Sequence, residues 1–211
     1  MRLRITFSKT GALRYTGHLD LHRMWERTCR RAGIPLSYSQ GFHPQPRISL
    51  AAALPLGFIG KAELLDLWLD QEEDTHQILK LLQEAAPPGL ILTSIQSIDP
   101  HQAALQTQVQ FADYEVFFLD TLDLQVLSSK IKIILTSASI MRQRRSRNYD
   151  LRPLIEFLQL NQITEDPSVS LTMRLSASPA ATGRPEEVLS EIGIQPEDTR
   201  ITRTGLILKT G

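Results

Sequence analysis

"HLDLHRMWERTCRRAGIP", residues 18–35, decides the first part of the fold. Apolar or small side chains recur in it at helical spacing, at positions 21, 24 or 25, 28 and 32. This spacing predicts a helix over residues 18–32. Gly33 is the residue type that ends a helix, and Pro35 prevents the helix from continuing.

Strands are predicted on both sides of this helix. Residues 2–8 alternate, with Leu3, Ile5 and Phe7 on one face, so they predict a strand with one buried side. The elements predicted after the helix are strands over 47–53 and 62–69, a helix from Asp74 or Thr75 to about 86, and a strand over 90–98. The order βαββαβ is the ferredoxin-like arrangement, one antiparallel sheet with two helices on one face.

The second half of the chain has a similar order of elements, βαβ(x)βαβ, in which x is an additional short helix. It predicts strands over 114–119, 133–142, 168–176 and 200–209, and helices over 122–132, within 148–160, and from Pro185 to near Gly193. The predicted fold class is therefore α+β, with tandem ferredoxin-like domains and antiparallel sheets. We place the domains at residues 1–100 and 112–211, with a polar joint near residues 99–112.

Composition narrows the class of protein. The chain is 42% hydrophobic and 22% charged, which is typical of a soluble globular protein. It has no apolar run near the roughly 20 residues of a membrane helix, and Met1 leads directly into a strand pattern, so we expect a cytoplasmic protein without a membrane partner. The single cysteine, Cys29, excludes an internal disulfide and a cysteine-ligated zinc or iron–sulfur site made by this chain alone. No cofactor is predicted.

The net charge of zero hides an uneven distribution of charge. Residues 1–50 contain nine basic and two acidic residues, whereas residues 61–124 contain two basic and twelve acidic residues. Residues 130–152 return to seven basic and one acidic residue. Such blocks create local fields that select partners, although solvated faces with clustered charges are the simpler interpretation.

Residues 12–57, "ALRYTGHLDLHRMWERTCRRAGIPLSYSQGFHPQPRISLAAALPLG", form one continuous unit. The unit resembles the radical-SAM-linked protein family, a domain of unknown function found beside, or fused to, a cobalamin-binding radical SAM protein. The residues that match the family pattern are Arg14, Tyr15, His18, Leu19, Asp20, Arg23, Arg30, Arg31, Tyr38, Ser39, Gly41, Phe42, Pro44, Pro46, Pro55 and Gly57. "NYDLRPLI", "RPEEVL" and "RTGLIL" in the second half also fit.

One position departs from that pattern. Gly17 stands where the family has a serine, which removes a hydroxyl helix cap and leaves Thr16 as a possible substitute. The resemblance implies association with a separate radical SAM enzyme and a link to RNA metabolism. It supplies no reaction.

The predicted first helix carries a row of arginines. Arg23, Arg27, Arg30 and Arg31 lie on adjacent rows of the helix, and arginine forks match the geometry of phosphate groups. Arg14 and Arg47 would extend the same patch, with Tyr15, Tyr38 and Phe42 among the cations. Cations for phosphates and rings for base stacking suit single-stranded RNA. The alternative is an exposed helix face made of good helix formers.

The connection over residues 37–47 is unusually rich in constrained residues. Gly41 suits a turn with positive φ, and Pro44 and Pro46 keep the residues before them extended. A stiff loop would present Tyr38, Phe42 and His43 to the basic helix. In the alternative, Phe42 and Tyr38 are core residues.

Two histidines and a glutamate share one helical face, His18, His22 and Glu26. Histidines at this spacing can bind a metal, although Leu19 stands where the metalloprotease motif requires glutamate. Three roles therefore stay open: a metal ligand, a substrate-facing histidine, and a surface or capping residue. We predict no metal site.

"RQRRSRNYDLR", residues 142–152, is the second basic block. At a hairpin tip, Arg142, Arg144, Arg145 and Arg147 would contact phosphates without reading bases. Asp150 and Arg152 could instead pair with each other.

Three functions follow from these features. The first is a non-catalytic RNA-binding accessory module of the tRNA or rRNA class, working with a separate radical SAM enzyme. The second is a metal-independent endoribonuclease of the CRISPR-repeat-processing type, in which His18, His22 or His43 acts with Tyr38. The third is a structural interaction domain with residues 61–84 as an acidic docking face. No catalytic residue is predicted; the candidate RNA-binding residues are Arg14, Tyr15, His18, His22, Arg23, Arg27, Arg30, Arg31, Tyr38, Phe42, His43, Arg47, Arg142, Arg144, Arg145 and Arg147.

Overall fold

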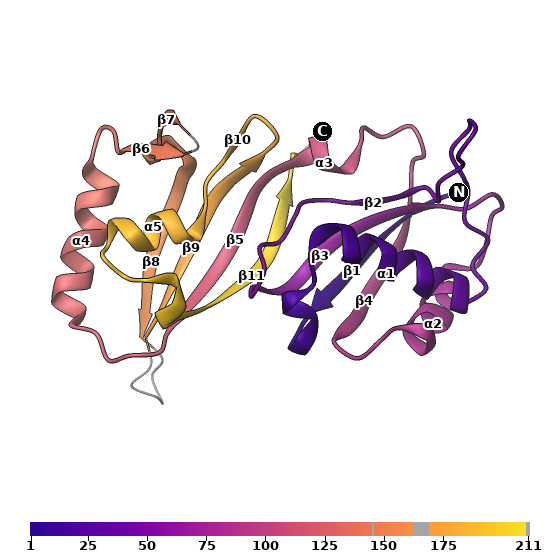
Figure 1. The fold of residues 1–211 in the computed structure, drawn as a ribbon, viewed down its shortest axis with the longest axis horizontal. Coiled ribbons are helices and arrows are strands. Elements are labelled where there is room, and N and C mark those ends of the chain that lie inside the picture. The colour runs from indigo at the N-terminus through magenta and orange to yellow at the C-terminus, as the bar shows by residue number, and fades with distance from the viewer. Residues whose placement is uncertain (145, 163–168, 210–211) are drawn as a thin grey trace. The chain divides into compact units, whose positions relative to one another are not determined.

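The computed structural model describes residues 1–144, 146–162 and 169–209 (Figure 1). The chain divides into two compact units, Met1–Val109 and Gln110–Gly211. Both units combine helices with a mostly antiparallel sheet, so the α+β class is confirmed. Within the described residues, every helix is too short or too polar to cross a membrane.

The first unit contains one sheet and two long helices. Its elements are β1 Arg2–Lys9, a 3-10 turn Gly11–Tyr15, α1 His18–Arg31, β2 Ile48–Leu50, β3 Ile59–Trp68, α2 Thr75–Ala85, β4 Leu90–Ile98 and α3 Leu105–Gln108. The strand order is β2-β3-β1-β4, and all neighbours are antiparallel. Figure 1 shows α1 and α2 on the same side of these strands. Phe7 of β1 and Trp25 of α1 meet edge to face in the core between them, with ring centroids 5.0 Å apart.

The end of α1 follows the sequence closely. Gly33 has φ +68°, a conformation that glycine adopts without strain. The N–H of Ile34 donates to the carbonyl of Cys29, and the N–H of Gly33 donates to that of Arg30. These two bonds form a Schellman motif, so the predicted end is confirmed. The start differs: Gly17 is the N-cap and makes no side-chain cap. Thr16, the possible substitute, is not the N-cap residue.

Strand β1 buries both of its faces at its start, so the prediction of one buried side is wrong. Arg2, Arg4 and Asp66 of β3 are 1%, 7% and 0% exposed. Asp66 accepts from Arg2 Nη2 at 2.7 Å and from Arg4 Nε at 2.8 Å. The Arg2 guanidinium also donates to the carbonyls of Gln102 and Ala103. Alternation of apolar residues cannot reveal a strand face buried through ion pairs.

The segment predicted as a polar joint, residues 99–112, contains structured chain. The Arg2 hydrogen bonds hold its first part, and α3 follows. Leu105 and Val109 are fully buried. The division between the two units falls after Val109, at the first residue of β5.

The second unit also contains one sheet. Its elements are β5 Val109–Phe118, α4 Leu124–Thr136, β6 Met141–Arg144, β7 Arg147–Asp150, a 3-10 turn Arg152–Leu154, β8 Ile155–Gln162, β9 Val169–Ser178, β10 Ala181–Thr182, α5 Pro185–Glu191, a 3-10 turn Pro196–Asp198 and β11 Thr199–Leu208. The strand order is β8-β9-β5-β11, with β10 paired to the end of β9. Strands β6 and β7 form a separate hairpin.

Two predictions in this unit are wrong. Residues 133–136, predicted as strand, belong to α4, whose buried residues Leu127, Ile131 and Ile134 recur at helical spacing. The predicted helix within residues 148–160 is a 3-10 turn between β7 and β8. The β-branched run at 133–134 resembles a strand locally, and burial on the helical period overrides that preference.

Candidate nucleic-acid interface

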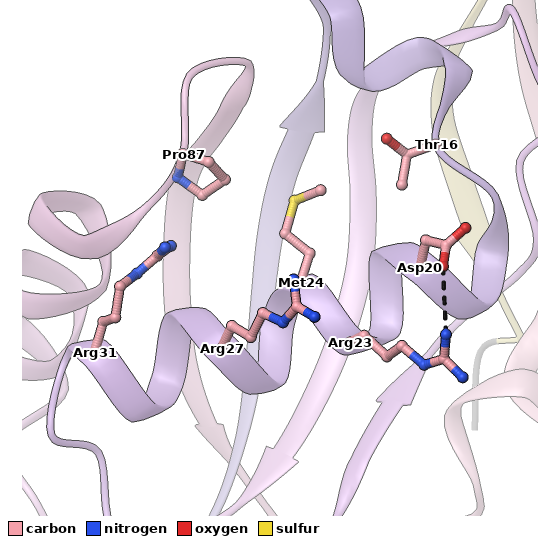
Figure 2. Close-up of a pocket in the computed structure, with 7 residues that line it drawn as sticks. All are labelled: Thr16, Asp20, Arg23, Met24, Arg27, Arg31 and Pro87. Atoms are coloured by element: carbon pink, nitrogen blue, oxygen red, sulfur yellow. Dashed lines mark ion pairs between the residues drawn. The ribbon is translucent and has the colours of Figure 1, made fainter.

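The arginines of α1 are all exposed, and three of them border a pocket. Arg23, Arg27 and Arg31 stand at i, i+4 and i+8, so they form one row along the helix. They line a pocket of about 350 Å³ whose remaining lining residues are Thr16, Asp20, Met24 and Pro87. Figure 2 shows this row beside Met24, with Arg31 directed toward Pro87. The pocket therefore has a cationic edge and a partly apolar floor.

The arginines differ in how they are held. Arg23 Nη1 lies 3.7 Å from Asp20 Oδ1, and both side chains are more than two-thirds exposed, so this pair contributes little. Arg31 Nη2 donates to the carbonyl of Ala85 at 2.8 Å, at the end of α2. The guanidinium groups of Arg27 and Arg30 make no hydrogen bond or ion pair with any residue that the structure describes. These two guanidinium groups are the cations most available to an anionic ligand.

The 37–47 connection folds back on itself as a narrow hairpin. The N–H of Arg47 donates to the carbonyl of Ser37 at 2.8 Å, and that of Ser39 donates to the carbonyl of Gln45 at 2.9 Å. Gly41 at the tip has φ +130°. The hairpin appears in Figure 1 as the dark loop that rises near the N-terminus.

The tip of this hairpin exposes its aromatic residue. Phe42 is fully exposed and Tyr38 is 49% exposed, so the alternative that both are core residues is wrong. His43 is also exposed. No residue of 37–47 lines the arginine pocket, which is bordered instead by Pro87 after α2. The hairpin and the arginine pocket are therefore separate features of the first unit.

The guanidinium groups of Arg14 and Arg47 each lie over an aromatic ring. The Arg14 guanidinium lies 4.7 Å from the ring centroid of Tyr15 and donates to its hydroxyl. The Arg47 guanidinium lies 4.8 Å from the Trp68 ring, as does that of Arg2. Cation–π contacts of this kind stabilise the fold. Arg2 is buried, whereas Arg14 is partly exposed and Arg47 is exposed. Neither arginine lines the α1 pocket.

His22 has a structural position. Its Nδ1 lies 3.0 Å from Glu26 Oε1, and its Nε2 lies 3.2 Å from the carbonyl oxygen of Ile48. Both ring nitrogens are thus engaged, and they join α1 to β2. His18 is exposed at the first position of α1. Over residues 1–144, 146–162 and 169–209 there is no cluster of three His, Cys, Asp or Glu that could hold a metal ion.

The single thiol is in the core. Cys29 is fully buried on the core-facing side of α1. Burial raises the pKa of the Cys29 thiol to about 12, with the nearby Glu26 carboxylate adding to the effect. A thiol with so high a pKa is a poor nucleophile. Cys29 therefore serves packing.

The second basic block forms the β6–β7 hairpin. Arg144 pairs across the hairpin with Arg147, and Ser146 in the turn has φ +66°. Arg142 turns toward α5, where it donates to the carbonyl of Glu187 at 2.8 Å and lies 3.4 Å from Glu191 Oε2. Arg144 and Arg147 line a pocket of about 830 Å³. Arg145 lies outside the described residues.

The side chains of Asp150 and Arg152 hold the backbone around this hairpin and form no ion pair with each other. Asp150 Oδ1 accepts from the N–H groups of Ile140 and Arg152, and these bonds hold the pKa of that carboxyl below its usual value. The Arg152 guanidinium donates to the carbonyls of Leu135 and Ile155. Sequence spacing suggested a local ion pair, because it cannot reveal carbonyl groups left open at the end of α4.

The acidic segment 61–84 is divided between the core and the surface. Glu63 and Asp66 are buried. Asp70, Glu72, Glu73, Asp74 and Glu84 are exposed. A docking face over the whole of residues 61–84 is therefore wrong, because its first part lies inside the unit.

Comparisons with known proteins bear on the fold and the family. A chain in the "Crystal Structure of a Cbf5-Nop10-Gar1 Complex" is similar with a TM-score of 0.51 and 9% sequence identity. The match covers 97% of this chain and 48% of that chain, so this chain spans about half of its length. At this identity the likeness concerns the fold alone. No curated protein matches. The family model described as "Uncharacterized protein conserved in bacteria (DUF2344)" matches residues 2–185, and the chain belongs to that family.

Proposed function

We propose that this chain is an RNA-binding accessory module without catalytic activity of its own, and that it works with a separate radical SAM enzyme. The observation that carries the RNA part is the exposed arginine row of α1. Arg27 and Arg30 lack an acidic partner among the described residues, and Arg23 has only a weak one. Unpaired guanidinium groups repeated along a helix favour a ligand with repeated phosphates.

The strand orders support a finer proposal about the fold. In the first unit the order is β2-β3-β1-β4, and in the second it is β8-β9-β5-β11. Each is the order of a ferredoxin-like sheet once the elements are numbered βαββαβ within their unit. We therefore propose two ferredoxin-like domains in tandem. Fold alone does not define function, so the RNA proposal rests on the surface and not on this architecture.

The aromatic hairpin supports RNA as the anionic ligand. A fully exposed phenylalanine at a hairpin tip offers one free face to a nucleobase, and base stacking is tolerant of sequence. Tyr38 lies on the same hairpin and is half-exposed. Phosphate-only ligands would make no use of these rings. Single-stranded or looped segments of a tRNA or rRNA are the ligands that use both features.

The radical SAM part of the proposal rests on the sequence of residues 12–57. That stretch resembles the radical-SAM-linked family over most of the helix and the hairpin. Reductive radical chemistry needs an iron–sulfur cluster held by several thiolates, and this chain has one buried thiol. The reaction would therefore belong to the partner. Co-purification of the chain with a tagged radical SAM protein encoded beside it would support the pairing, and clean separation of the two would contradict it.

The RNA part is tested by binding to a fluorescent single-stranded RNA at low salt. Arg27→Ala/Arg30→Ala should weaken binding by about tenfold or more for each arginine, because each lost charged contact is worth roughly 1.5–3 kcal/mol. Lys80→Ala is the matched control, since Lys80 is exposed on the neighbouring α2 and does not line the pocket. The control should change the affinity by less than about twofold. Equal loss in both variants, or no binding by the parent chain, would refute the proposal.

A further inference from the structure

A second pocket is lined only by residues of the second unit, and none of them belongs to α1. It has a volume of about 830 Å³, within the usual range of roughly 300–1,000 Å³ for small-molecule sites. The β6–β7 hairpin contributes one wall, and the turn between β9 and β10 contributes another. Its lining residues are Arg144, Arg147, Tyr149, Asp150, Pro153, Leu154, Ala180, Ala181 and Thr182.

Two like charges face this pocket from opposite strands. Arg144 and Arg147 are directly opposed across the hairpin. Like charges at opposed positions destabilise a strand pair. Neither guanidinium has a hydrogen bond or ion pair with a residue in the described part of the chain. An anion held between them would remove the repulsion and accept hydrogen bonds from both.

Besides the two arginines and the polar residues Asp150 and Thr182, the pocket has an apolar and aromatic surface. Pro153, Leu154 and Ala181 contribute aliphatic atoms, and Tyr149 contributes a ring. Burial raises the pKa of Tyr149 to about 12, and a hydrogen bond from its hydroxyl to Glu187 adds to this effect. The phenol is therefore neutral and anchored at its hydroxyl end. The ring remains as a flat surface on which a ligand can stack.

The walls of the pocket are fixed by contacts outside it. Arg142 is bound to α5 through Glu191, and Asp150 Oδ1 is occupied by two backbone N–H groups. Gly183, just after β10, lies close to the 3-10 turn, because an added Cβ would be only 3.1 Å from the carbonyl oxygen of Leu154, which is tighter than an ordinary contact. This close approach sets the β10 wall against the 3-10 turn. Rigid walls reduce the entropy that a ligand must lose on binding.

We propose that this pocket binds a mononucleotide, with its phosphate between Arg144 and Arg147 and its base against Tyr149 and Leu154. The chemistry is the same for a free nucleotide and for a phosphorylated terminal nucleotide of an RNA strand. The site lies in the second unit, and it requires neither α1 nor the 37–47 hairpin. It therefore stands independently of the RNA-binding proposal.

Calorimetry with the whole chain tests the site. The probes are AMP, UMP, adenosine and inorganic phosphate. At least one nucleotide should bind at least about tenfold more tightly than adenosine or phosphate alone, because only a nucleotide uses both the cations and the ring. Failure of both nucleotides to saturate at millimolar concentration, or equal affinity for phosphate and nucleotide, overturns the proposal.

Substitutions show which side chains contact the nucleotide. Arg144→Ala and Arg147→Ala should each weaken nucleotide binding by about tenfold or more. Arg200→Ala removes an exposed cation of the same unit that does not line the pocket, and should leave affinity within about twofold. Tyr149→Phe keeps the ring and should retain most of the affinity, whereas Tyr149→Ala should lose it. Equal effects of Arg147→Ala and Arg200→Ala would overturn the site.

Two further measurements are needed. One distinguishes a free nucleotide from the end of an RNA strand, and the other distinguishes this site from the RNA-binding surface on α1. An RNA strand with a 5′-phosphate should compete with the bound nucleotide if strand ends enter the pocket, and a strand with a 5′-hydroxyl should not. If free nucleotides are the natural ligand, neither strand competes. Arg27→Ala/Arg30→Ala should leave nucleotide affinity unchanged. A parallel loss of affinity in that variant would contradict a separate site.

Discussion

Phe42 is the residue whose role the structure constrains most sharply. Its side chain is fully exposed at the tip of the 37–47 hairpin, so it contributes no core packing. Phe42→Ala should therefore change the free energy of unfolding by less than about 0.5 kcal/mol. If the ring stacks on a base, the same change should weaken RNA binding by about 1–3 kcal/mol. A thermal melt beside an RNA titration measures both quantities.

One outcome would contradict the exposed position of Phe42. A large drop in melting temperature with unchanged affinity of the folded fraction would mean that the ring packs in solution. Leu56→Ala is a suitable control, because Leu56 is another exposed apolar residue of the first unit, outside the hairpin. It should change neither quantity.

Gly89 shows how a single backbone position fixes the surroundings of the arginine pocket. Its φ is +89°, and an added Cβ would lie 2.6 Å from the carbonyl oxygen of Thr10. Its own carbonyl accepts the N–H of Thr10. Gly89→Ala should lower the free energy of unfolding by about 2 kcal/mol or more, because strain and a backbone clash combine. Gly11 has φ +58°, and an added Cβ would have no neighbour within 4 Å. Gly11→Ala should therefore lower the free energy of unfolding by only about 1 kcal/mol. Equal losses in urea unfolding would show that the clash does not exist.

At the scale of elements, the stability of the first unit depends on the buried charges of its sheet. Asp66 on β3 compensates both Arg2 and Arg4 on β1, and Arg2 in turn holds the chain at Gln102. Removing the carboxylate charge leaves two buried guanidinium groups without compensation. Asp66→Asn should therefore lower the free energy of unfolding by about 3–5 kcal/mol.

The second sheet contains a comparable aspartate–arginine ion pair. Asp113 on β5 binds Arg174 on β9, with Nε–Oδ1 at 2.7 Å, but both side chains are partly exposed. Asp113→Asn should cost about 1 kcal/mol or less, since solvent screens the pair. Chemical denaturation of both variants compares the two sites. Similar losses would mean that burial does not determine the strength of these pairs.

Elements with local end signals could be predicted from the sequence. α1 and α2 each combine apolar residues at helical spacing with a residue that marks one end. Gly33 marks the end of α1 and Asp74 marks the start of α2, and the structure confirms both. The region from residue 133 to 160 could not be predicted, because its signals conflict. The last turn of α4 is β-branched, and the Arg152 side chain, not a cap in the local sequence, satisfies the Leu135 carbonyl. Tertiary contacts decide such segments.

The candidate site shows the same limit. Helical spacing correctly placed the four arginines of α1 on the surface, because the opposite face needed Leu21 and Trp25 in the core. The expected gathering of Arg14, Arg47 and the hairpin around those arginines does not occur in the pocket. Aromatic partners at Tyr15 and Trp68 hold two of the cations instead. The Trp68 contact depends on a residue far along the chain, which spacing does not reveal.

At the scale of the whole molecule, charge is balanced overall and concentrated locally. The net charge is zero, yet the first 50 residues carry an excess of seven positive charges. Association with RNA depends on the cations that meet phosphates and on the counterions that they release, not on the total charge of the protein. A neutral protein can therefore bind RNA with strong salt dependence.

The salt dependence of RNA binding tests this account most directly. With about five phosphate contacts, the slope of log affinity against log salt concentration should be near −3.5 for a single-stranded RNA. Arg27→Ala/Arg30→Ala should reduce the magnitude of that slope by about 1.4, or about 0.7 for each lost contact. Phe42→Ala should weaken binding without changing the slope. A parent slope near zero, or an unchanged slope in the double arginine variant, would contradict an RNA interface on α1.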